Sequence, residues 1–131
     1  MTTELRVRKV METEFVCLSP ADPIRRAIGA LIDSGAAAAP VVEDDGTLSG
    51  ILTQKDCFRP TLHASYYQEW RGTVGDHMST NAVTIEASDD LVRAAELFLD
   101  HPYRVFPVVE AAKLVGMLDR RAVLVELFRT G

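Results

Sequence analysis

Two stretches of the chain carry apolar residues at the spacing of an amphipathic helix. The two stripes are Ile24, Ala27, Ile28, Leu31 and Ile32 and, further along, Leu91, Ala94, Ala95, Phe98 and Leu99. Pro23 suits the first turn of the earlier helix and Gly35 its C-terminal stop, while Ser88 and Asp89 suit the start of the later helix. We therefore expect two helices, each with one buried face.

Short runs rich in β-branched residues follow each helix and predict buried strands. Pro40 and Pro107 each precede a Val-Val pair, and we expect each proline at the first strand residue, where no ladder donor is needed. Asp44, Asp45 and Gly46 form a turn signal. The expected strands are 15–18, 39–43 and 48–53, then 82–85, 106–110 and 114–119, with closing helices near 54–58 and 120–128.

The two halves of the chain are copies of one pattern. A shift of 67 residues aligns 7–43 with 74–110 without a gap, and 12 of those 37 pairs are identical, among them Met11/Met78. One deletion then aligns Gly50 with Gly116. The expected order is β-α-β-β-α, twice, and two copies are too few for a solenoid.

Neither copy is long enough to bury much core alone. We expect an α+β fold in which the two repeats pack sheet to sheet about a pseudo-two-fold axis as one compact module, with two clefts between the copies. The expected boundaries are repeat one over 1–60, an inter-repeat connection over 61–73 and repeat two over 74–131.

Composition narrows the class of protein. The chain has 131 residues, of which 47% are hydrophobic and 25% charged, which excludes a disordered chain. The net charge is −5, so the chain lacks the excess of basic residues that is typical of a nucleic-acid binder. The longest uncharged run, 34–42, is too short to span a bilayer, and the N-terminus has no signal-peptide core. Cys17 and Cys57 are expected to be free thiols in the cytoplasm, with Cys17 in the core.

The repeated strings resemble a pair of CBS (cystathionine β-synthase) domains, the tandem called a Bateman module. The resemblance rests on three strings in copy one and their matches in copy two. They are Val10-Met11-x-Thr13-x-x-Val16-x-Leu18, Pro40-Val41-Val42-x-x-x-Gly46 and Gly50-Ile51-Leu52-Thr53-x-x-Asp56, then Met78-x-Thr80-x-x-Val83-x-Ile85, Pro107-Val108-Val109 and Leu114-Val115-Gly116-Met117-Leu118. The resemblance covers roughly residues 6–130 and implies an adenosine-containing ligand in an inter-repeat cleft, a homodimer and a regulatory role.

Asp56 is the strongest candidate binding residue. It follows a predicted strand and opens a helix, so its carboxylate could accept hydrogen bonds from a ribose diol. The Thr53 hydroxyl and the amides of the helix start could hold phosphate, and Lys55 completes this candidate set. The alternative is structural: Thr53 caps the helix and Asp56 occupies its first turn.

Copy two departs from this motif. Asp119 replaces Thr53 and Ala122 replaces Asp56, so this position offers no carboxylate for a diol and adds one that repels phosphate. Arg120 and Arg121 add positive charge, although solvated arginines are the simpler explanation. We expect the second cleft not to hold a nucleotide in the usual way.

The stretches before the buried strands are the expected cleft walls. The small side chains of 36–39 would admit a base or, alternatively, pack tightly against the helix. Arg104 could pair with phosphate or form a surface salt bridge, and His101 is expected to be a solvent-facing loop residue. The other candidate ligand contacts are Ala38, Val105 and Phe106 and, on the adenine side by resemblance, Thr13 and Val16.

Residues 61–72 have no counterpart in copy two and hold Tyr66, Tyr67 and Trp70. Such aromatics suit a dimer or partner contact, or they cover the chain's own core. Pro60 is expected to disturb the helix before this segment.

The preferred function is a regulatory sensor that binds AMP, ADP, ATP or a related adenosine compound and signals through a homodimer or a protein partner. We expect neither an enzyme nor a catalytic cofactor, since no catalytic motif occurs, and no metal, because His63, His77 and His101 follow no ligand spacing. The alternative is a ligand-free dimerisation module. Direct nucleic-acid binding is a third and weaker alternative, and membrane binding is not expected.

Overall fold

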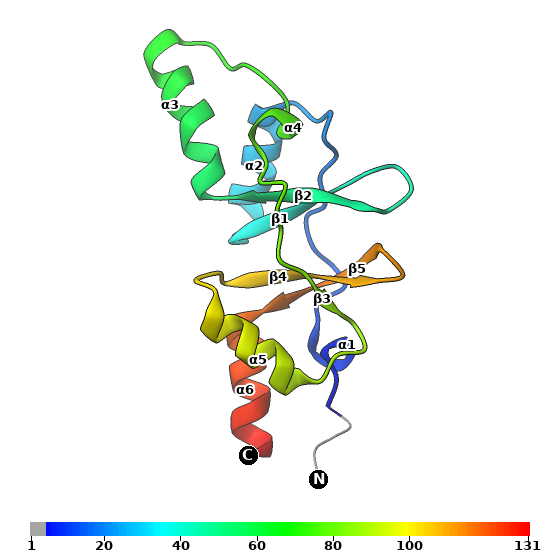
Figure 1. Cartoon of the computed structure of the whole chain (residues 1–131). Helices are drawn as coiled ribbons and strands as arrows, with labels where there is room; N and C mark the ends of the chain where they lie inside the picture. The colour runs from blue at the N-terminus through cyan, green and yellow to red at the C-terminus, as the bar shows by residue number, and fades with distance from the viewer. Residues whose placement is uncertain (1–4) are drawn as a thin grey trace. The chain divides into compact units, whose positions relative to one another are not determined.

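The computed structural model describes residues 5–131, which form two compact units. Unit 1 contains residues 5–15 and 83–131, and unit 2 contains residues 16–82. Figure 1 follows the chain from blue to red through both units. Within the described residues no helix is long and apolar enough to cross a membrane.

Unit 2 is built on an antiparallel pair of strands. β1 (Ala38–Val42) pairs with β2 (Leu48–Thr53), with Ala38 opposite Thr53. The glycine of the turn between them, Gly46, has a φ of 89°, which agrees with the predicted turn. The helical elements are α2 (Ile24–Ser34), the 3₁₀ turn η1 (Lys55–Cys57), α3 (Phe58–Tyr67) and α4 (Val74–His77).

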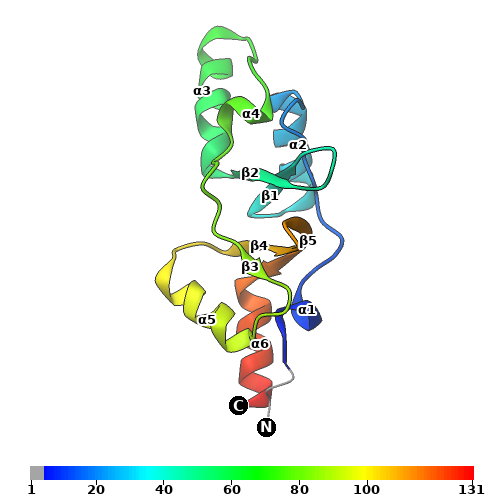
Figure 2. The same cartoon turned by 45° about the vertical axis from the view of Figure 1, so that its right-hand side comes forward.

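Unit 1 has a three-stranded sheet in the order β3-β4-β5 (Figure 2). β3 (Ile85–Glu86) runs parallel to β4 (Val105–Glu110), which is antiparallel to β5 (Lys113–Asp119). The helices are α1 (Val7–Val10), α5 (Leu91–Asp100) and α6 (Arg120–Thr130). The mixture of helices and strands confirms the α+β class.

Both predicted helices are present, but Pro23 is the N-cap of α2 and not a residue of its first turn. α2 ends at Gly35, whose φ of 71° is the left-handed conformation that favours glycine. α5 begins at Leu91, later than the predicted start at Ser88 and Asp89, because Asp90 is the N-cap and its side chain accepts a hydrogen bond from the Val92 N–H. The closing helix of copy one is longer than predicted, since η1 continues directly into α3.

Pro60 does not disturb this helix. It is the third residue of α3, in the first turn, where backbone N–H groups have no partner within the helix. The helix continues to Tyr67, and the ring of Pro60 is buried.

The first predicted strand of copy one is wrong. Over 15–18 only Leu18 pairs with a strand: its N–H donates to the Pro40 carbonyl, and its own carbonyl accepts from the Val42 N–H. In copy two the strand is reduced to Ile85–Glu86. Cys17 is exposed rather than in the core, because the run that contains it is not a strand.

Pro40 and Pro107 lie at the third residue of their strands, not at the first. The Pro40 carbonyl accepts from the Leu18 N–H, so the proline nitrogen also faces the Leu18 side. The Leu18 carbonyl is already satisfied there by the Val42 N–H. No donor is therefore missing at Pro40.

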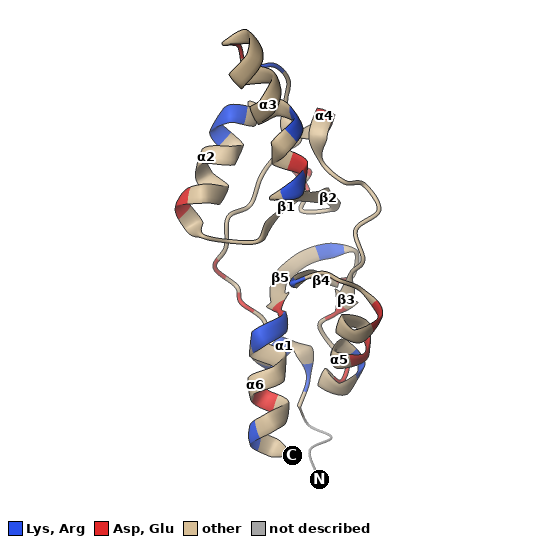
Figure 3. Ribbon diagram, turned by 90° about the vertical axis from the view of Figure 1, so that its left-hand side faces the viewer, with Lys and Arg blue, Asp and Glu red and all other residues tan. Residues whose placement is uncertain are grey.

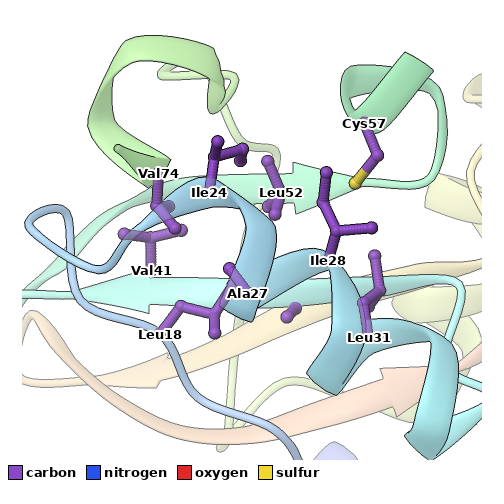
Figure 4. Packing of buried hydrophobic residues seen from close by; sticks show 10 residues of the cluster. Leu18, Ile24, Ala27, Ile28, Leu31, Val41, Leu52, Cys57 and Val74 are labelled. Carbon is purple, nitrogen blue, oxygen red and sulfur yellow. The ribbon is translucent and has the colours of Figure 1, made fainter. Parts of the chain in front are cut away.

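Each unit buries its own apolar core. In unit 2 the face of α2 packs on β1 and β2 through residues such as Ile24, Ile28 and Leu52 (Figure 4). In unit 1 Phe106 is fully buried and lies 4.4 Å from Phe98, measured between ring centroids. The two predicted helical stripes therefore face their cores except at their last residues, Ile32 and Leu99, which are 71% and 88% exposed.

The compact units do not coincide with the sequence repeats, because the leading segment of each repeat packs in the unit of the other. Val74, from repeat two, is fully buried in the core of unit 2, and Val7, from repeat one, is fully buried in the core of unit 1. The backbone of Ser79 exchanges two hydrogen bonds with Ile51, both of 2.9 Å. Glu12 pairs in the same way with Met117, at 2.8 and 2.9 Å.

The repeated glycines Gly50 and Gly116 permit these pairings. A Cβ on Gly50 would lie 2.5 Å from the Ser79 carbonyl oxygen, and one on Gly116 would lie 2.6 Å from the Met11 sulfur. Only glycine leaves the leading segment room to lie against the strand. This close approach explains why both positions are glycine.

We predict that Gly50→Ala destabilises the protein by about 1–3 kcal/mol, because the Ser79 backbone must move away from β2. Gly29→Ala is the matched control, since a Cβ at Gly29 has no atom within 4 Å and α2 gains a better helix former. Urea unfolding of both variants measures the difference. Equal stability of the two variants would contradict the proposed close approach.

Candidate functional site

Thr53 and Asp56 lie together where β2 passes into η1. The Thr53 N–H donates to Asp56 Oδ2 at 3.0 Å, and the Asp56 N–H donates to Thr53 Oγ1 at 3.1 Å. This reciprocal pair is the arrangement of a capping box. The hydrogen bonds therefore confirm that Thr53 caps the helical segment and that Asp56 lies in its first turn, whereas contact of Asp56 with a ribose stays a prediction.

Asp56 has a further partner that the sequence analysis missed. The Ser79 hydroxyl donates to both carboxylate oxygens of Asp56, at 3.2 and 3.1 Å. Ser79 comes from the leading segment of repeat two, 23 residues further along the chain. Both side chains belong to unit 2, so this arrangement is a property of that unit alone.

The carboxylate of Asp56 keeps capacity for a ligand. An ionised carboxylate offers about four lone-pair sites, and the Thr53 N–H and the Ser79 hydroxyl do not fill them. Asp56 is half-buried and Lys55 beside it is exposed. The arrangement can therefore accept hydrogen bonds from a diol and place a positive charge close by.

Other aspartates of the chain make the same turn without the additional donor. Asp76 accepts from the Thr73 N–H at 2.9 Å and from the Thr73 hydroxyl at 3.3 Å, in a capping box at the start of α4. Asp22 accepts from the Ser19 N–H. Asp76 is thus an internal reference for a carboxylate that only caps.

The matching position of unit 1 is organised differently. Asp119 is the N-cap of α6 and accepts from the N–H groups of Arg121 and Ala122, at 3.0 and 3.2 Å. One residue therefore provides the cap that Thr53 and Asp56 share in unit 2. Figure 3 shows basic residues in the first turn of α6, where Arg120 and Arg121 are exposed.

A hollow of about 450 Å³ lies beside this cap in unit 1. Its charged lining is mixed, with Lys9 and Arg121 against Asp119 and Glu126. Because Asp119 already occupies the first amides of α6, an anion there would face a carboxylate.

Ala38 and Ala39 are buried, with Ala39 in the core of unit 2. Tight packing thus accounts for these two alanines. Ala38 is the cross-strand neighbour of Thr53, which keeps it close to the candidate site. Val16 is half-buried and packs against the same core.

The remaining candidate contacts belong to unit 1. Phe106 is a core residue, so its side chain offers no exposed face to a base, whereas Val105 is half-buried. Arg104 is exposed and forms no ion pair with any residue from 5 to 131, so of its two alternatives the surface salt bridge is wrong, and pairing with phosphate stays a prediction. Thr13 is exposed.

His101 is half-buried rather than solvent-facing. Its ring stacks on Tyr103 with centroids 5.6 Å apart and meets the edge of Phe106 at 6.1 Å. The aromatic contacts fix the segment that precedes β4.

The segment 61–72 divides into two parts. Trp70 packs partly against the core of unit 2, with Arg25 over its ring at 5.9 Å. Tyr66 and Tyr67 are 79% and 69% exposed. The tryptophan thus covers the chain's own core, while the tyrosines remain available to a partner.

Cys57 lies directly after Asp56 and is buried, with its thiol donating to the Thr53 carbonyl at 3.3 Å. Burial, and secondarily the Asp56 charge, raises the pKa of the Cys57 thiol to about 11. A thiol with this pKa stays protonated at neutral pH and is a poor nucleophile. Over residues 5–131 no group of three metal-ligating side chains comes together.

Known proteins resemble this chain in sequence. The model of the CBS domain family matches residues 7–60 and 74–129. The CBS domain-containing protein YhcV of Bacillus subtilis is 31% identical over 113 residues, which cover 86% of this chain and 78% of YhcV. The uncharacterized protein MJ1225 of Methanocaldococcus jannaschii is 25% identical over 112 residues, and the chain spans only 39% of its length.

The fold agrees with a solved structure that contains a nucleotide. The crystal structure of CBSX2 in complex with AMP, a CBS-pair protein from Arabidopsis thaliana, superposes with a TM-score of 0.83. It is 26% identical to this chain, and the match covers 96% of this chain and 98% of that one.

We predict that the cap at Asp76 makes stability depend on acid pH. Hydrogen bonds from the Thr73 backbone and then from its hydroxyl lower the pKa of the Asp76 carboxyl from its ordinary value of 3.8. A carboxylate whose pKa is lowered by folding stabilises the protein at pH values above its ordinary pKa. This contribution to stability is lost as the pH falls through the lower pKa of the folded state. Urea unfolding of the wild type and Asp76→Asn should therefore differ near neutral pH and converge in acid. A difference that persists in strong acid would show that the charge of Asp76 is irrelevant.

Proposed function

Because the chain belongs to the CBS domain family, we propose that it is a regulatory module that binds an adenosine-containing nucleotide at the Thr53–Asp56 end of unit 2. The observation that carries this proposal is the half-buried Asp56 carboxylate, which is hydrogen-bonded at the end of β2 and keeps lone pairs that can accept further hydrogen bonds. The AMP complex of CBSX2, which matches nearly the whole chain, supports the ligand class. AMP is accordingly the first compound to test, with ADP and ATP next.

Different residues of unit 2 contact different chemical groups of the proposed ligand. Asp56 accepts hydrogen bonds from the 2′- and 3′-hydroxyls of the ribose, since a carboxylate can accept from both. The Thr53 hydroxyl and Lys55 attract the phosphate, aided by the positive end of the helical segment that starts there. Ala38, beside Thr53 across the sheet, presents no bulk to the base.

The resemblance also assigns ligand contacts to Arg104, Val105, Phe106, Thr13 and Val16, and these assignments stay predictions. Unit 1 lacks the diol acceptor, because Ala122 stands where unit 2 has Asp56. We therefore expect one nucleotide for each chain.

The signal passes through a homodimer. Each unit exposes three large apolar side chains at matching positions of the repeat: Ile32, Phe58 and Leu62 in unit 2 and Leu99, Leu124 and Phe128 in unit 1. Their exposed fractions run from 54% to 88%. A second copy with the same two faces would cover both of them, and Tyr66 and Tyr67 extend the face of α3.

The proposed role is regulatory rather than catalytic. The raised pKa of the buried Cys57 thiol keeps it protonated at neutral pH, which makes it a poor nucleophile. The second candidate function is a dimerisation module without a ligand, which the two repeated apolar faces would serve equally well. Calorimetry with AMP separates the two functions.

We predict that Asp56→Ala weakens AMP binding about 10- to 100-fold, because a hydrogen bond to a charged group is lost. Stability should fall by about 0.5–2 kcal/mol, since Asp56 also caps a helical segment. Titration calorimetry and thermal melting measure both effects.

Asp76→Ala is the matched control, because it removes an equivalent cap that touches no proposed ligand. It should lower stability and leave AMP affinity unchanged. If Asp56→Ala retains full affinity while losing stability, Asp56 is only a cap and the ligand-free alternative stands.

We predict that the wild type is a dimer at micromolar concentration and that the double variant Phe58→Glu, Leu124→Glu is a monomer. Charge placed at these matched positions makes burial of both faces unfavourable. Light scattering measures the molar mass of each protein, which is compared with the 14.4 kDa of one chain.

Val92→Glu is the control for this experiment. Val92 is 54% exposed on α5 but lies outside the repeated set, because its counterpart in copy one is Arg25. This variant should remain dimeric. A monomeric wild type would refute the proposed assembly.

A further inference from the structure

We propose that Ser79 is a positioning residue for the ligand site: its hydroxyl holds the Asp56 carboxylate in the orientation that receives the ribose diol. The proposal rests on the proposed function, and it adds to that function a residue from the opposite repeat. It makes the site of unit 2 a joint product of both repeats, since Thr53 and Asp56 come from the first and Ser79 from the second.

The Ser79 hydroxyl starts from a fixed backbone. Both the N–H and the carbonyl of Ser79 are bonded to Ile51 at 2.9 Å, in the middle of β2. Gly50 leaves no free space under this pairing, because even a Cβ there would lie 2.5 Å from the Ser79 oxygen. The hydroxyl can therefore act as a stable reference point for Asp56.

Two donors from different elements fix the carboxylate group. The Thr53 N–H is bonded to Oδ2, and the Ser79 hydroxyl lies 3.2 Å from Oδ1 and 3.1 Å from Oδ2. A single donor would leave the carboxylate free to rotate, whereas two donors restrict it to one orientation. A ligand that finds its acceptor already oriented loses less conformational entropy on binding.

The other caps of the chain show that helix capping does not require this second donor. Asp76 is bonded only within its own turn, by Thr73, and Asp22 by Ser19. Asp89 accepts only from the Glu86 N–H, at 3.1 Å. Among these described caps, Asp56 is the one that receives a hydroxyl from a distant segment, so the Ser79 contact needs an explanation other than capping.

The second repeat supports the same conclusion. The position equivalent to Ser79 is Glu12, which pairs with Met117 as Ser79 pairs with Ile51. The residue equivalent to Asp56 in that unit is Ala122. Where the carboxylate is absent, the hydroxyl donor is absent too, although the backbone pairing persists. The donor and the acceptor therefore change together, as expected for two parts of one site.

The test measures the affinity of wild type, Ser79→Ala and Ser79→Thr for AMP and for 2′,3′-dideoxy-AMP by calorimetry. Ser79→Ala should weaken AMP binding about 3- to 10-fold, because the carboxylate loses its fixed orientation. It should leave the binding of the dideoxy compound unchanged, since that compound has no diol for Asp56 to receive. Ser79→Thr keeps the hydroxyl and should restore AMP affinity.

Ser65→Ala is the control, because it removes a serine hydroxyl that bonds only the Thr61 carbonyl within α3. Equal loss of affinity for both nucleotides in Ser79→Ala would show a general structural role and overturn the proposal. Unchanged or tighter AMP binding by Ser79→Ala would overturn the proposal too, since the Ser79 hydroxyl would then contribute nothing to binding or would compete with the diol for Asp56. Absence of AMP binding by the wild type would instead refute the proposed function itself and, with it, this inference.

Discussion

Two backbone pairings, Ser79 with Ile51 of β2 and Glu12 with Met117 of β5, hold each repeat's leading segment against a strand of the other repeat. Much else in the two units depends on them. They require glycine at 50 and 116, and they bring Val74 and Val7 into cores that would otherwise lack a buried side chain. They also place Ser79 within hydrogen-bonding distance of Asp56.

The Thr53–Asp56 box performs two tasks with one carboxylate. In the unliganded protein it satisfies backbone N–H groups at a helix start, as Asp76 does elsewhere. Its remaining lone pairs are available for a ligand. In unit 1 Asp119 alone provides the cap, so that position can carry alanine at 122 without loss of the helix start. Capping and ligand binding are thus separable, and only unit 2 combines them.

The regular elements were predictable because burial imposes a period on the sequence. The stripe on α2 and the Pro-Val-Val strands have that period, and their positions were found within a residue or two. The pattern around Phe15 was misleading, since an apolar run shows that residues avoid water but not that they have a partner strand. Cys17 was placed in the core for the same reason.

The exchange of leading segments was not predictable from periodicity. Val7 and Val74 occupy the same position of the repeat, and an apolar pattern indicates that a residue is buried without indicating in which copy. Thr53 and Asp56 were found because they form a motif next to a strand. Ser79 was missed, although a signal existed: Asp56 in one unit is matched there by Ser79, whereas the other unit has Ala122 and Glu12 at the equivalent positions.

The exchanged segments also set the order in which the chain can fold during synthesis. Unit 2 cannot complete its core until Val74 has left the ribosome, after every strand of the first repeat. Unit 1 waits longer, because its Arg8 bonds Glu110, 102 residues away, and contacts between such distant residues form slowly. Throughout that interval Val7 and Met11 have no strand to cover them. The arrangement that joins the two repeats therefore leaves the nascent chain with an exposed apolar N-terminal segment until the second repeat is made.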